Sequence, residues 1–552
     1  MRRPGHVRGI AADDLVAGAP RIVDDGHGGE WERSDGEPRP SGAEPGPETG
    51  LSDRQRALIL LVVVVGVLMA AVDTTIVVLA LPAMERSLHI ALSAVVWVIV
   101  AYILVVTILA TQVGRLGDMF GRTRMYELGF AVFIVGSALC ATATSETTII
   151  VFRIVQGVGG AFLTANSGAV LADAFPKQQR GKAFGYNAIG WNVGAILGIL
   201  LGGFIITYAS WRWIFWINVP TGLLALALAL KVLRDRGPRE RQRLDLLGMS
   251  LLGAGLFGVL WAMTKLATSK LSGPLLATLV GGVAVLVVFV VVEHHRDAPM
   301  VNLRLFRIPT FAPTLLAALF QGLANFAVLF LVLMYLQGVR HLTPLDASLL
   351  LIPGYLVGGI IGPICGRLAD RFGAVWPATI GLGVEVLALG VYSQLTPTTP
   401  LGVVTVAAVL NGLGAGAFMP ANNSAVMKVA PGRDFGIASG MLRTFANIGM
   451  VFSFSVAVLV AARSISRQLA FAIFVGTTSL PRRLGSAFTT GLHAAFFSSI
   501  GFMALAAVLS ATRGLRATKP VMAGEVDPGA SAVRQGTARA RVGGANLDDG
   551  DG

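Results

Sequence analysis

Charged residues are scarce in this sequence: Asp, Glu, Lys and Arg together make up 14% of its 552 residues. Soluble globular domains carry about 25%, so the scarcity excludes an ordinary soluble domain. Hydrophobic residues make up 54% of the chain, and its mean hydropathy is +0.70. They come in blocks of about 20 residues, the length that crosses the hydrocarbon core of a bilayer as a helix. The composition therefore predicts an all-α polytopic membrane protein.

Other absences narrow the function. The two cysteines, Cys140 and Cys365, lack the spacing of a metal site. The sequence has no P-loop for ATP hydrolysis and no cluster of nucleophile, base or metal ligands such as an enzyme needs. We therefore expect no enzymatic activity, no metal and no other cofactor. Residues 1–50 contain no apolar core of a cleavable signal peptide.

The net charge of +13 reflects 44 Lys and Arg against 31 Asp and Glu. Nucleic-acid binding would explain such a charge, but the basic residues lie in short connectors between apolar runs, as the positive-inside rule predicts. With the N-terminus inside, the inner connectors hold about 19 Lys and Arg and the outer ones about 9. We therefore expect both termini in the cytoplasm and no nucleic-acid partner.

About fourteen apolar runs are long enough to span a membrane. They cover residues 57–81, 93–113, 125–140, 147–171, 183–208, 214–230, 246–263, 274–292, 310–337, 347–365, 374–392, 401–427, 435–461 and 492–512. Residues 1–55 and 514–552 hold too few apolar residues to fold, and we expect disordered cytoplasmic extensions there.

A charged, glycine-rich loop occurs twice in the sequence. It occupies residues 114–124 and returns at 366–373, again between two apolar runs. A weaker repeat relates residues 160–166 to 416–422. These repeats align spans one to six with spans nine to fourteen and leave two spans as an insert. The sequence therefore predicts two pseudo-symmetric six-helix bundles, over 56–233 and 301–513, with a two-helix insert over 234–300. The substrate path would lie between the bundles, and residues 463–491 would form a long outer loop.

Four segments in this order resemble the major facilitator superfamily and, within it, the fourteen-span drug:proton antiporters. Residues 114–124 resemble motif A, 153–161 motif B, and 72–82 the first-helix motif of this subgroup. Residues 194–203, with 210–220 after them, resemble motif C and the outer signature that follows it. The resemblance covers about residues 55–515. Two positions depart from it: Val78 replaces the usual Asn, and Ile199 replaces the Pro that the family associates with export.

Asp73 lies within an otherwise uncharged apolar run. An intramembrane carboxylate is costly unless it is neutralised, paired or facing water, and such groups are usually functional. We therefore expect Asp73 to carry the coupled proton, although a permanently protonated residue in a fixed helix contact would also fit. Arg153 could form an ion pair with Asp73, or reach the outer surface instead, and Gln156 follows one turn later on the same face.

The repeated loop is interpreted as a gate. Asp118 could accept hydrogen bonds from Arg122 and from a helix N-terminus of the other half. A positive-inside anchor is the simpler alternative, but it does not explain Asp118 and its counterpart Asp370. The glycines expected to allow close backbone approach at this loop are Gly114, Gly117 and Gly121.

Small residues and two further charges complete the set of candidates. A stripe at four-residue spacing is expected to allow close helix packing, where the other half would rock or seal: Gly190, Gly194, Gly198 and Gly202, with Gly203 after them. Glu385 lies in mid-span and is either an interior structural group or a second site for a proton or cationic substrate. Arg443 lies in the thirteenth span and either lines the path or reaches the inner surface.

The sequence therefore predicts a proton-coupled antiporter that exports amphipathic organic compounds by alternating access across a bacterial cytoplasmic membrane. Its expected partners are protons, lipid and a small-molecule substrate, and the chain is expected to be monomeric. A proton-coupled importer remains an alternative because Ile199 replaces the exporter proline. A non-transporting receptor or scaffold is a further one.

Overall fold

The computed structural model describes residues 51–89, 92–235, 244–296, 299–301, 303–429, 435–461 and 485–517. Most of the two predicted extensions, and most of the predicted outer loop, lie outside these residues. The described residues form helices only: α1 (Asp53–Leu88), α2 (Leu92–Phe120), α3 (Arg122–Thr142), α4 (Glu146–Ala174), α5 (Lys177–Tyr208), α6 (Trp213–Trp216), α7 (Asn218–Val232), α8 (Leu246–Thr268), α9 (Gly273–His294), η1 (Leu303–Arg307), α10 (Phe311–Met334), η2 (Tyr335–Val339), α11 (Pro344–Phe372), α12 (Val375–Tyr392), α13 (Leu401–Val429), α14 (Phe435–Ala461) and α16 (Gly485–Ala517).

All fourteen predicted spans coincide with helices, the sixth with α6 and α7 together. Thirteen of the described spans meet the length and hydropathy needed to cross a membrane. Several boundaries differ from the prediction. α1 already begins at Asp53, because the Ser52 side chain and Gln55 form a capping box at its N-terminus.

α2 continues to Phe120 and α11 to Phe372, so most residues of the two predicted loops are helical. α16 begins at Gly485, inside the range predicted as loop. α16 also continues to Ala517, into the predicted disordered tail.

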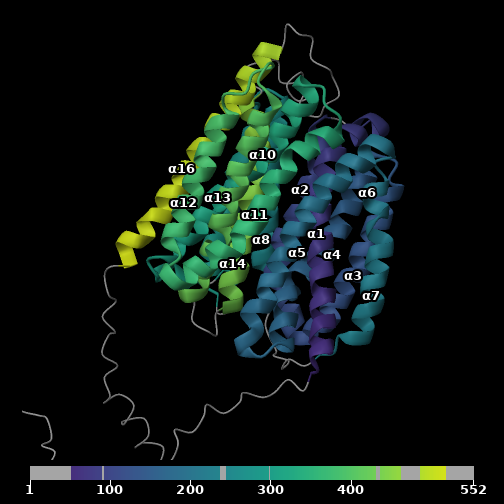
Figure 1. The fold of residues 1–552 in the computed structure, drawn as a ribbon, viewed down its shortest axis with the longest axis vertical. Helices are drawn as coiled ribbons and strands as arrows, with labels where there is room; N and C mark the ends of the chain where they lie inside the picture. The colour runs from purple at the N-terminus through teal and green to yellow at the C-terminus, as the bar shows by residue number, and fades with distance from the viewer. Residues whose placement is uncertain are drawn as a thin grey trace, which may run out of the picture. The chain divides into compact units, whose positions relative to one another are not determined.

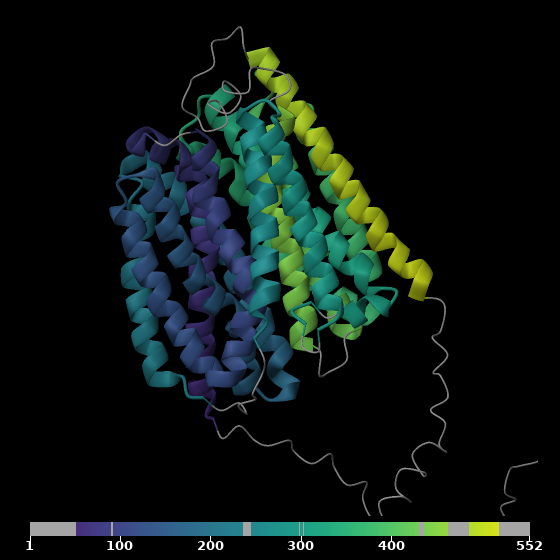
Figure 2. The same cartoon turned by 180° about the vertical axis from the view of Figure 1, so that it is seen from behind.

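The two halves of the chain repeat one packing pattern (Figures 1 and 2). In the first half α1 packs on α5, α2 and α3 both pack on α4, and α3 packs on α7. In the second half α10 packs on α14, α11 and α12 both pack on α13, and α12 packs on α16. The halves meet through two equivalent pairs, α5 with α11 and α2 with α14. The expected pseudo-symmetry is therefore visible in the contacts between helices.

The insert helices pack on each other, and α8 also contacts α2 and α14, one helix from each half. Polar contacts fix the two ends of the insert. At the start of α8 the Asp245 backbone N–H donates to Gln112 Oε1 (3.2 Å), and at the end of α9 Glu293 Oε2 accepts from the Val301 backbone N–H (2.7 Å). Burial raises the pKa of Asp245, but hydrogen bonds and the Arg296 guanidinium (3.3 Å) outweigh it and leave this pKa below its usual value.

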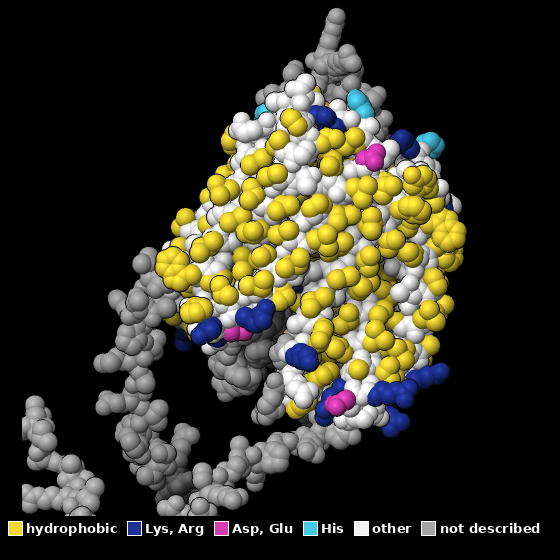
Figure 3. Space-filling model, viewed as in Figure 1, with side chains coloured by type: hydrophobic (Ala, Val, Ile, Leu, Met, Phe, Trp, Pro, Cys, Tyr) yellow, Lys and Arg dark blue, Asp and Glu magenta, His cyan; other side chains and the backbone are white. Residues whose placement is uncertain are grey.

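Basic side chains gather where α1 begins, and we call this side of the helices the basic face (Figure 3). The residues that define it are Arg122, Lys182, Arg367, Arg371 and Lys428. Figure 3 shows the described surface hollowed between the two halves at this face. Near the opposite face the halves are closed, because Gly203 at the end of α5 packs against Pro344 and Ser348 at the start of α11. The hollow between the halves therefore opens toward the basic face.

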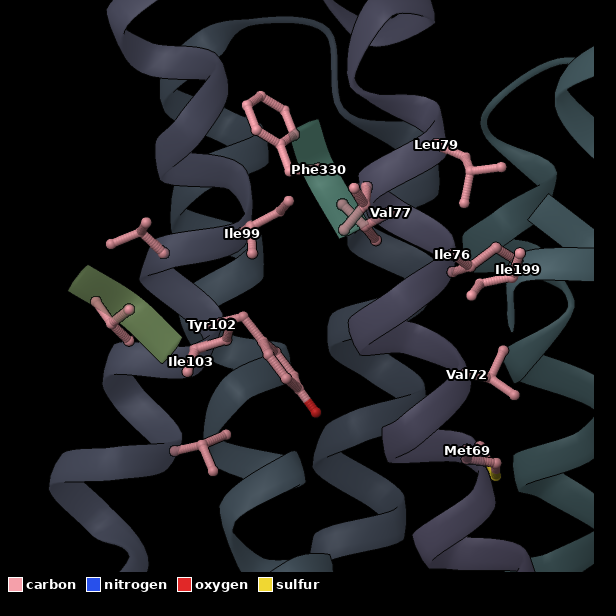
Figure 4. Close-up of a cluster of buried hydrophobic side chains, with 14 of the residues drawn as sticks. Met69, Val72, Ile76, Val77, Leu79, Ile99, Tyr102, Ile103, Ile199 and Phe330 are labelled. Atoms are coloured by element: carbon pink, nitrogen blue, oxygen red, sulfur yellow. The ribbon is translucent and has the colours of Figure 1, made fainter. Parts of the chain in front are cut away.

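Apolar side chains fill the space around α1 (Figure 4). Val72 and Ile76 face Ile199 of α5, while Ile99 and Tyr102 of α2 lie on another side of α1. Ile76 and Ile199 are fully buried. Ile199, the residue in place of the motif C proline, therefore contributes an apolar side chain to the α1–α5 contact.

The glycine stripe of α5 faces α1 of its own half. A methyl group at Gly190 would contact Val64, one at Gly194 Leu68, and one at Gly202 Ile76. The expectation that the stripe meets the other half was therefore wrong for four of its five glycines. Only Gly203 faces the second half, because it lies one residue, about 100° of helix rotation, beyond the stripe.

Gly198→Ala is expected to destabilise the protein by about 1–3 kcal/mol, because its methyl group would lie 2.8 Å from the Val72 carbonyl oxygen. Gly185→Ala on the same helix is the matched control, since nothing lies within 4 Å of its added methyl group. Thermal unfolding in detergent should show a lower midpoint for the first variant only. Equal midpoints would contradict the assigned packing.

Candidate functional site

Asp73 of α1 and Arg153 of α4 form a fully buried ion pair. Arg153 Nη1 lies 2.6 Å from Asp73 Oδ2, and the Arg153 Nε–H donates to the Val98 carbonyl of α2 at 2.8 Å. Gln156 closes the network: its amide nitrogen donates to Asp73 Oδ1 at 2.8 Å, and its oxygen accepts from Arg153 Nη1 at 2.8 Å. The three residues proposed from the sequence thus form one network.

The surroundings of this pair could not be read from the sequence. The Ser137 hydroxyl of α3 accepts from Gln156 (3.2 Å) and from Asn218 of α7 (3.1 Å). The Tyr102 ring of α2 lies under the Arg153 guanidinium, 4.4 Å from its centre. An aromatic face stabilises a cation in such a desolvated place. Five helices of the first half therefore contribute to the network.

This arrangement couples a protonatable group to helix packing. Both Asp73 carboxylate oxygens accept hydrogen bonds, so the ionised form is fully satisfied. Protonation of Asp73 would remove the charge that compensates Arg153, and a buried, uncompensated guanidinium is costly. Protonation of Asp73 would therefore weaken the contact that this pair makes between α1 and α4.

The first copy of the repeated loop is held by a carboxylate–arginine–carboxylate cluster. Arg122 contacts Asp118 at 2.8 Å and Asp173, at the end of α4, at 2.7 Å. A third carboxylate, Asp235, accepts a hydrogen bond from the Thr123 backbone N–H at 3.0 Å. Asp173 and Asp235 are distant in sequence, and no motif signalled them. The expected contact of Asp118 with a helix N-terminus of the second half stays a prediction.

The three glycines of this segment differ in backbone conformation and in the space available for a side chain. Gly121 has φ +110°, which favours glycine, and a methyl group there would contact the Asp235 carboxylate. A methyl group at Gly117 would contact the Asn166 side chain of α4. Gly114 has open space beside it, so no close backbone approach between described residues occurs there in this arrangement, and its role in the gate stays a prediction.

The second copy of the loop uses different partners. Asp370 accepts a hydrogen bond from the Ser424 hydroxyl of α13 at 2.7 Å. Lys428, one turn further along α13, lies 4.0 Å from Asp370 and donates to the Ala369 carbonyl at 2.8 Å. In both copies the Asp lies in the last turn of the second helix of its half, and its contacts tie this turn to the fourth helix of the same half.

Glu385 is fully buried in the second half and is held by amides. Gln321 and Asn325 of α10 donate to its Oε1 at 3.2 and 3.4 Å, and Asn411 of α13 donates to Asn325 at 3.1 Å. Within the described residues Glu385 forms no ion pair. The helices involved, α10, α12 and α13, correspond to α1, α3 and α4, so this cluster is the second-half counterpart of the Asp73 network.

Arg443 does not extend along its helix toward the basic face. Its side chain is exposed, and Nη1 donates to the Thr164 carbonyl of α4, in the other half, at 3.0 Å. The sequence also missed a buried arginine, Arg513 of α16. Its guanidinium donates to Asn422 of α13 (2.8 Å) and to Thr314 of α10 (3.3 Å).

Arg153→Gln should lower stability by about 3–5 kcal/mol, because it leaves the Asp73 carboxylate buried without its cation. The double variant Asp73→Asn/Arg153→Gln should recover most of this loss, since an amide pair needs no counter-charge. Thermal unfolding midpoints of the two single variants and the double variant test the coupling. Additive losses would contradict it.

The sequence was compared with protein families and with known proteins. A family model of the Major Facilitator Superfamily matches residues 63–454 and 314–521. Over 418 residues the chain is 32% identical to the tetracenomycin C resistance and export protein of Streptomyces glaucescens, covering 74% of this chain and 76% of that protein. Over 399 residues it is 30% identical to the riboflavin transporter RibZ of Clostridioides difficile (strain 630), covering 72% and 86%.

Solved structures support the fold. A bacterial homolog of the human lysosomal transporter Spinster, in an inward-facing and occupied conformation, matches with a TM-score of 0.60. The two chains are 16% identical, and the match covers 84% of this chain and 98% of the other. The xylose transporter XylE of E. coli, in a partially occluded inward-open conformation, matches with a TM-score of 0.54 at 14% identity, covering 84% and 98%.

The chain therefore belongs to the Major Facilitator Superfamily of membrane transporters, and its export-protein relatives fit the drug:proton antiporter type.

Proposed function

We propose that this transporter exports amphipathic organic compounds in exchange for protons. The buried Asp73–Arg153–Gln156 network carries this proposal, because it places one protonatable carboxyl at the contact of α1 and α4 in an otherwise apolar core. The relative that is named as the tetracenomycin C resistance and export protein favours export.

The positive-inside rule assigns the basic face to the cytoplasm. Both chain termini then lie in the cytoplasm, and the hollow between the halves opens to it (Figure 3). In a bacterium the membrane would be the cytoplasmic membrane, as the bacterial relatives suggest. In this arrangement a substrate enters the hollow from the cytoplasm or the inner leaflet.

The exchange follows from competition between two arrangements of α1 and α4. With Asp73 ionised, its pair with Arg153 stabilises the arrangement described above. A proton from outside reaches Asp73 when the halves open to that side, and its release to the cytoplasm restores the pair. Alternating access then requires the α5–α11 contact at Gly203 to open while the basic face closes.

The repeated loops are proposed to form the cytoplasmic gate. The Asp118–Arg122–Asp173 cluster and the Asp370–Ser424 bond each fix the end of a second helix to the fourth helix of the same half. Closure of the basic face would bring these two helix ends together. Contacts between the loops and the opposite half would then hold the outward-open state.

Asp73→Asn is expected to reduce compound-dependent proton release at least tenfold, because an amide cannot exchange a proton. The measurement uses inverted membrane vesicles holding an imposed proton gradient and a panel of amphipathic compounds. The matched control is Asp53→Asn, also on α1, whose side chain is 97% exposed. It should release protons as the native chain does.

Loss of release in Glu385→Gln, with full release in Asp73→Asn, would move the proton site to the second half. Accumulation of a compound inside right-side-out vesicles, driven by an inward proton gradient, would support import instead. No gradient-dependent flux of any compound would contradict proton coupling.

A further inference from the structure

Four Asp, Glu, Lys and Arg side chains of the described helices lie more than five residues from either helix end: Asp73, Arg153, Glu385 and Arg443. The first three are fully buried, whereas Arg443 is exposed. Asp73 and Arg153 neutralise each other, and Glu385 is enclosed by amides. Of these four charges, Arg443 is the one that a molecule between the halves could reach.

Arg443 lies where the two halves face each other. It belongs to α14, which packs on α2 of the first half, and its guanidinium reaches α4 at Thr164. Thr164 follows Arg153 on α4 by 11 residues, about 16 Å along the helix toward the basic face. Arg443 is therefore on the hollow side of the buried ion pair, two turns inside α14.

The guanidinium of Arg443 is available to a ligand. An arginine has five N–H donors, and the described contact of Arg443 is a single hydrogen bond to a backbone carbonyl. Within the described part of the chain no carboxylate forms an ion pair with it. A structural arginine would use its fork of donors, as the buried Arg513 does with Asn422, Thr314 and Ser510.

We infer that Arg443 binds the negatively charged group of the substrate, and that the transported compounds are amphipathic organic anions. This rests on the proposed function, in that it takes the hollow between the halves as the substrate path. A guanidinium binds carboxylate, sulfonate or phenolate groups through charge-assisted hydrogen bonds and repels organic cations. The basic face adds a positive potential at the entrance, although positive-inside topology already accounts for it.

The inference can be tested by binding to the purified full-length protein in detergent. Fluorescein and rhodamine 6G share one ring system but carry opposite charges at neutral pH, so they separate charge from shape. Fluorescence anisotropy should give at least tenfold tighter binding of fluorescein. Arg443→Gln should lose at least tenfold in fluorescein affinity and leave rhodamine 6G unchanged. Arg443→Lys should keep most of the affinity, because it keeps the charge.

The matched control is Arg86→Gln, an exposed arginine that bonds within its own helix at the opposite face. It should bind fluorescein as the native chain does. Equal or tighter binding of rhodamine 6G, absence of fluorescein binding, or unchanged fluorescein affinity in Arg443→Gln would each overturn the inference. Because the assay needs no gradient, charge selectivity that depends on Arg443 would stand even if proton coupling failed in vesicles.

Discussion

The cost of leaving a polar group unsatisfied inside a membrane governs this structure. Where charged side chains occur within the spans, they are paired, enclosed by amides or directed into the space between the halves. The Asp73–Arg153 pair shows the first solution, Glu385 the second and Arg443 the third. Each solution gives a different chemical capacity, because a paired carboxyl, an enclosed carboxyl and an accessible guanidinium respond differently to protons and ligands.

The two halves of the repeat use different solutions at equivalent places. Equivalent helices form the Asp73 and the Glu385 clusters, but one cluster contains an arginine and the other contains amides. The repeated loops show the same divergence, since Arg122 links two carboxylates in the first half while Ser424 and Lys428 hold Asp370 in the second. The two halves therefore share one backbone arrangement but differ in the polar side chains that they place in it.

Transport requires the two halves to move largely as units. Close contacts such as the glycine stripe of α5 against α1 join helices within one half, where tight packing resists rearrangement. The main helix contacts between the halves are α5 with α11 and α2 with α14, and the insert helix α8 contacts both α2 and α14. Rocking about these contacts would change the side to which the hollow opens, while within the first half only the α1–α4 contact at Asp73 rearranges.

The sequence determined the helices and their order. Each span had to be a long apolar helix, because only a helix satisfies its own backbone in lipid, and the repeated loops set the equivalence of the halves. It also allowed an ion pair between Asp73 and Arg153, since each is an isolated charge in an apolar run, but it left open that Arg153 reaches the outer surface instead. Four-residue spacing predicted that the glycines of α5 share one face.

Tertiary packing decided the rest. Several polar contacts of the two sites join residues that are 51 to 112 positions apart in the sequence, and no local pattern predicts them. They are the contacts made by Asp173, Asp235, Gln321 and Asn411. Spacing could not say that the glycine stripe faces α1, nor that Arg443 reaches α4 instead of the membrane surface. A sequence pattern fixes which side chains share a helix face, but the direction of that face depends on how every neighbouring helix packs.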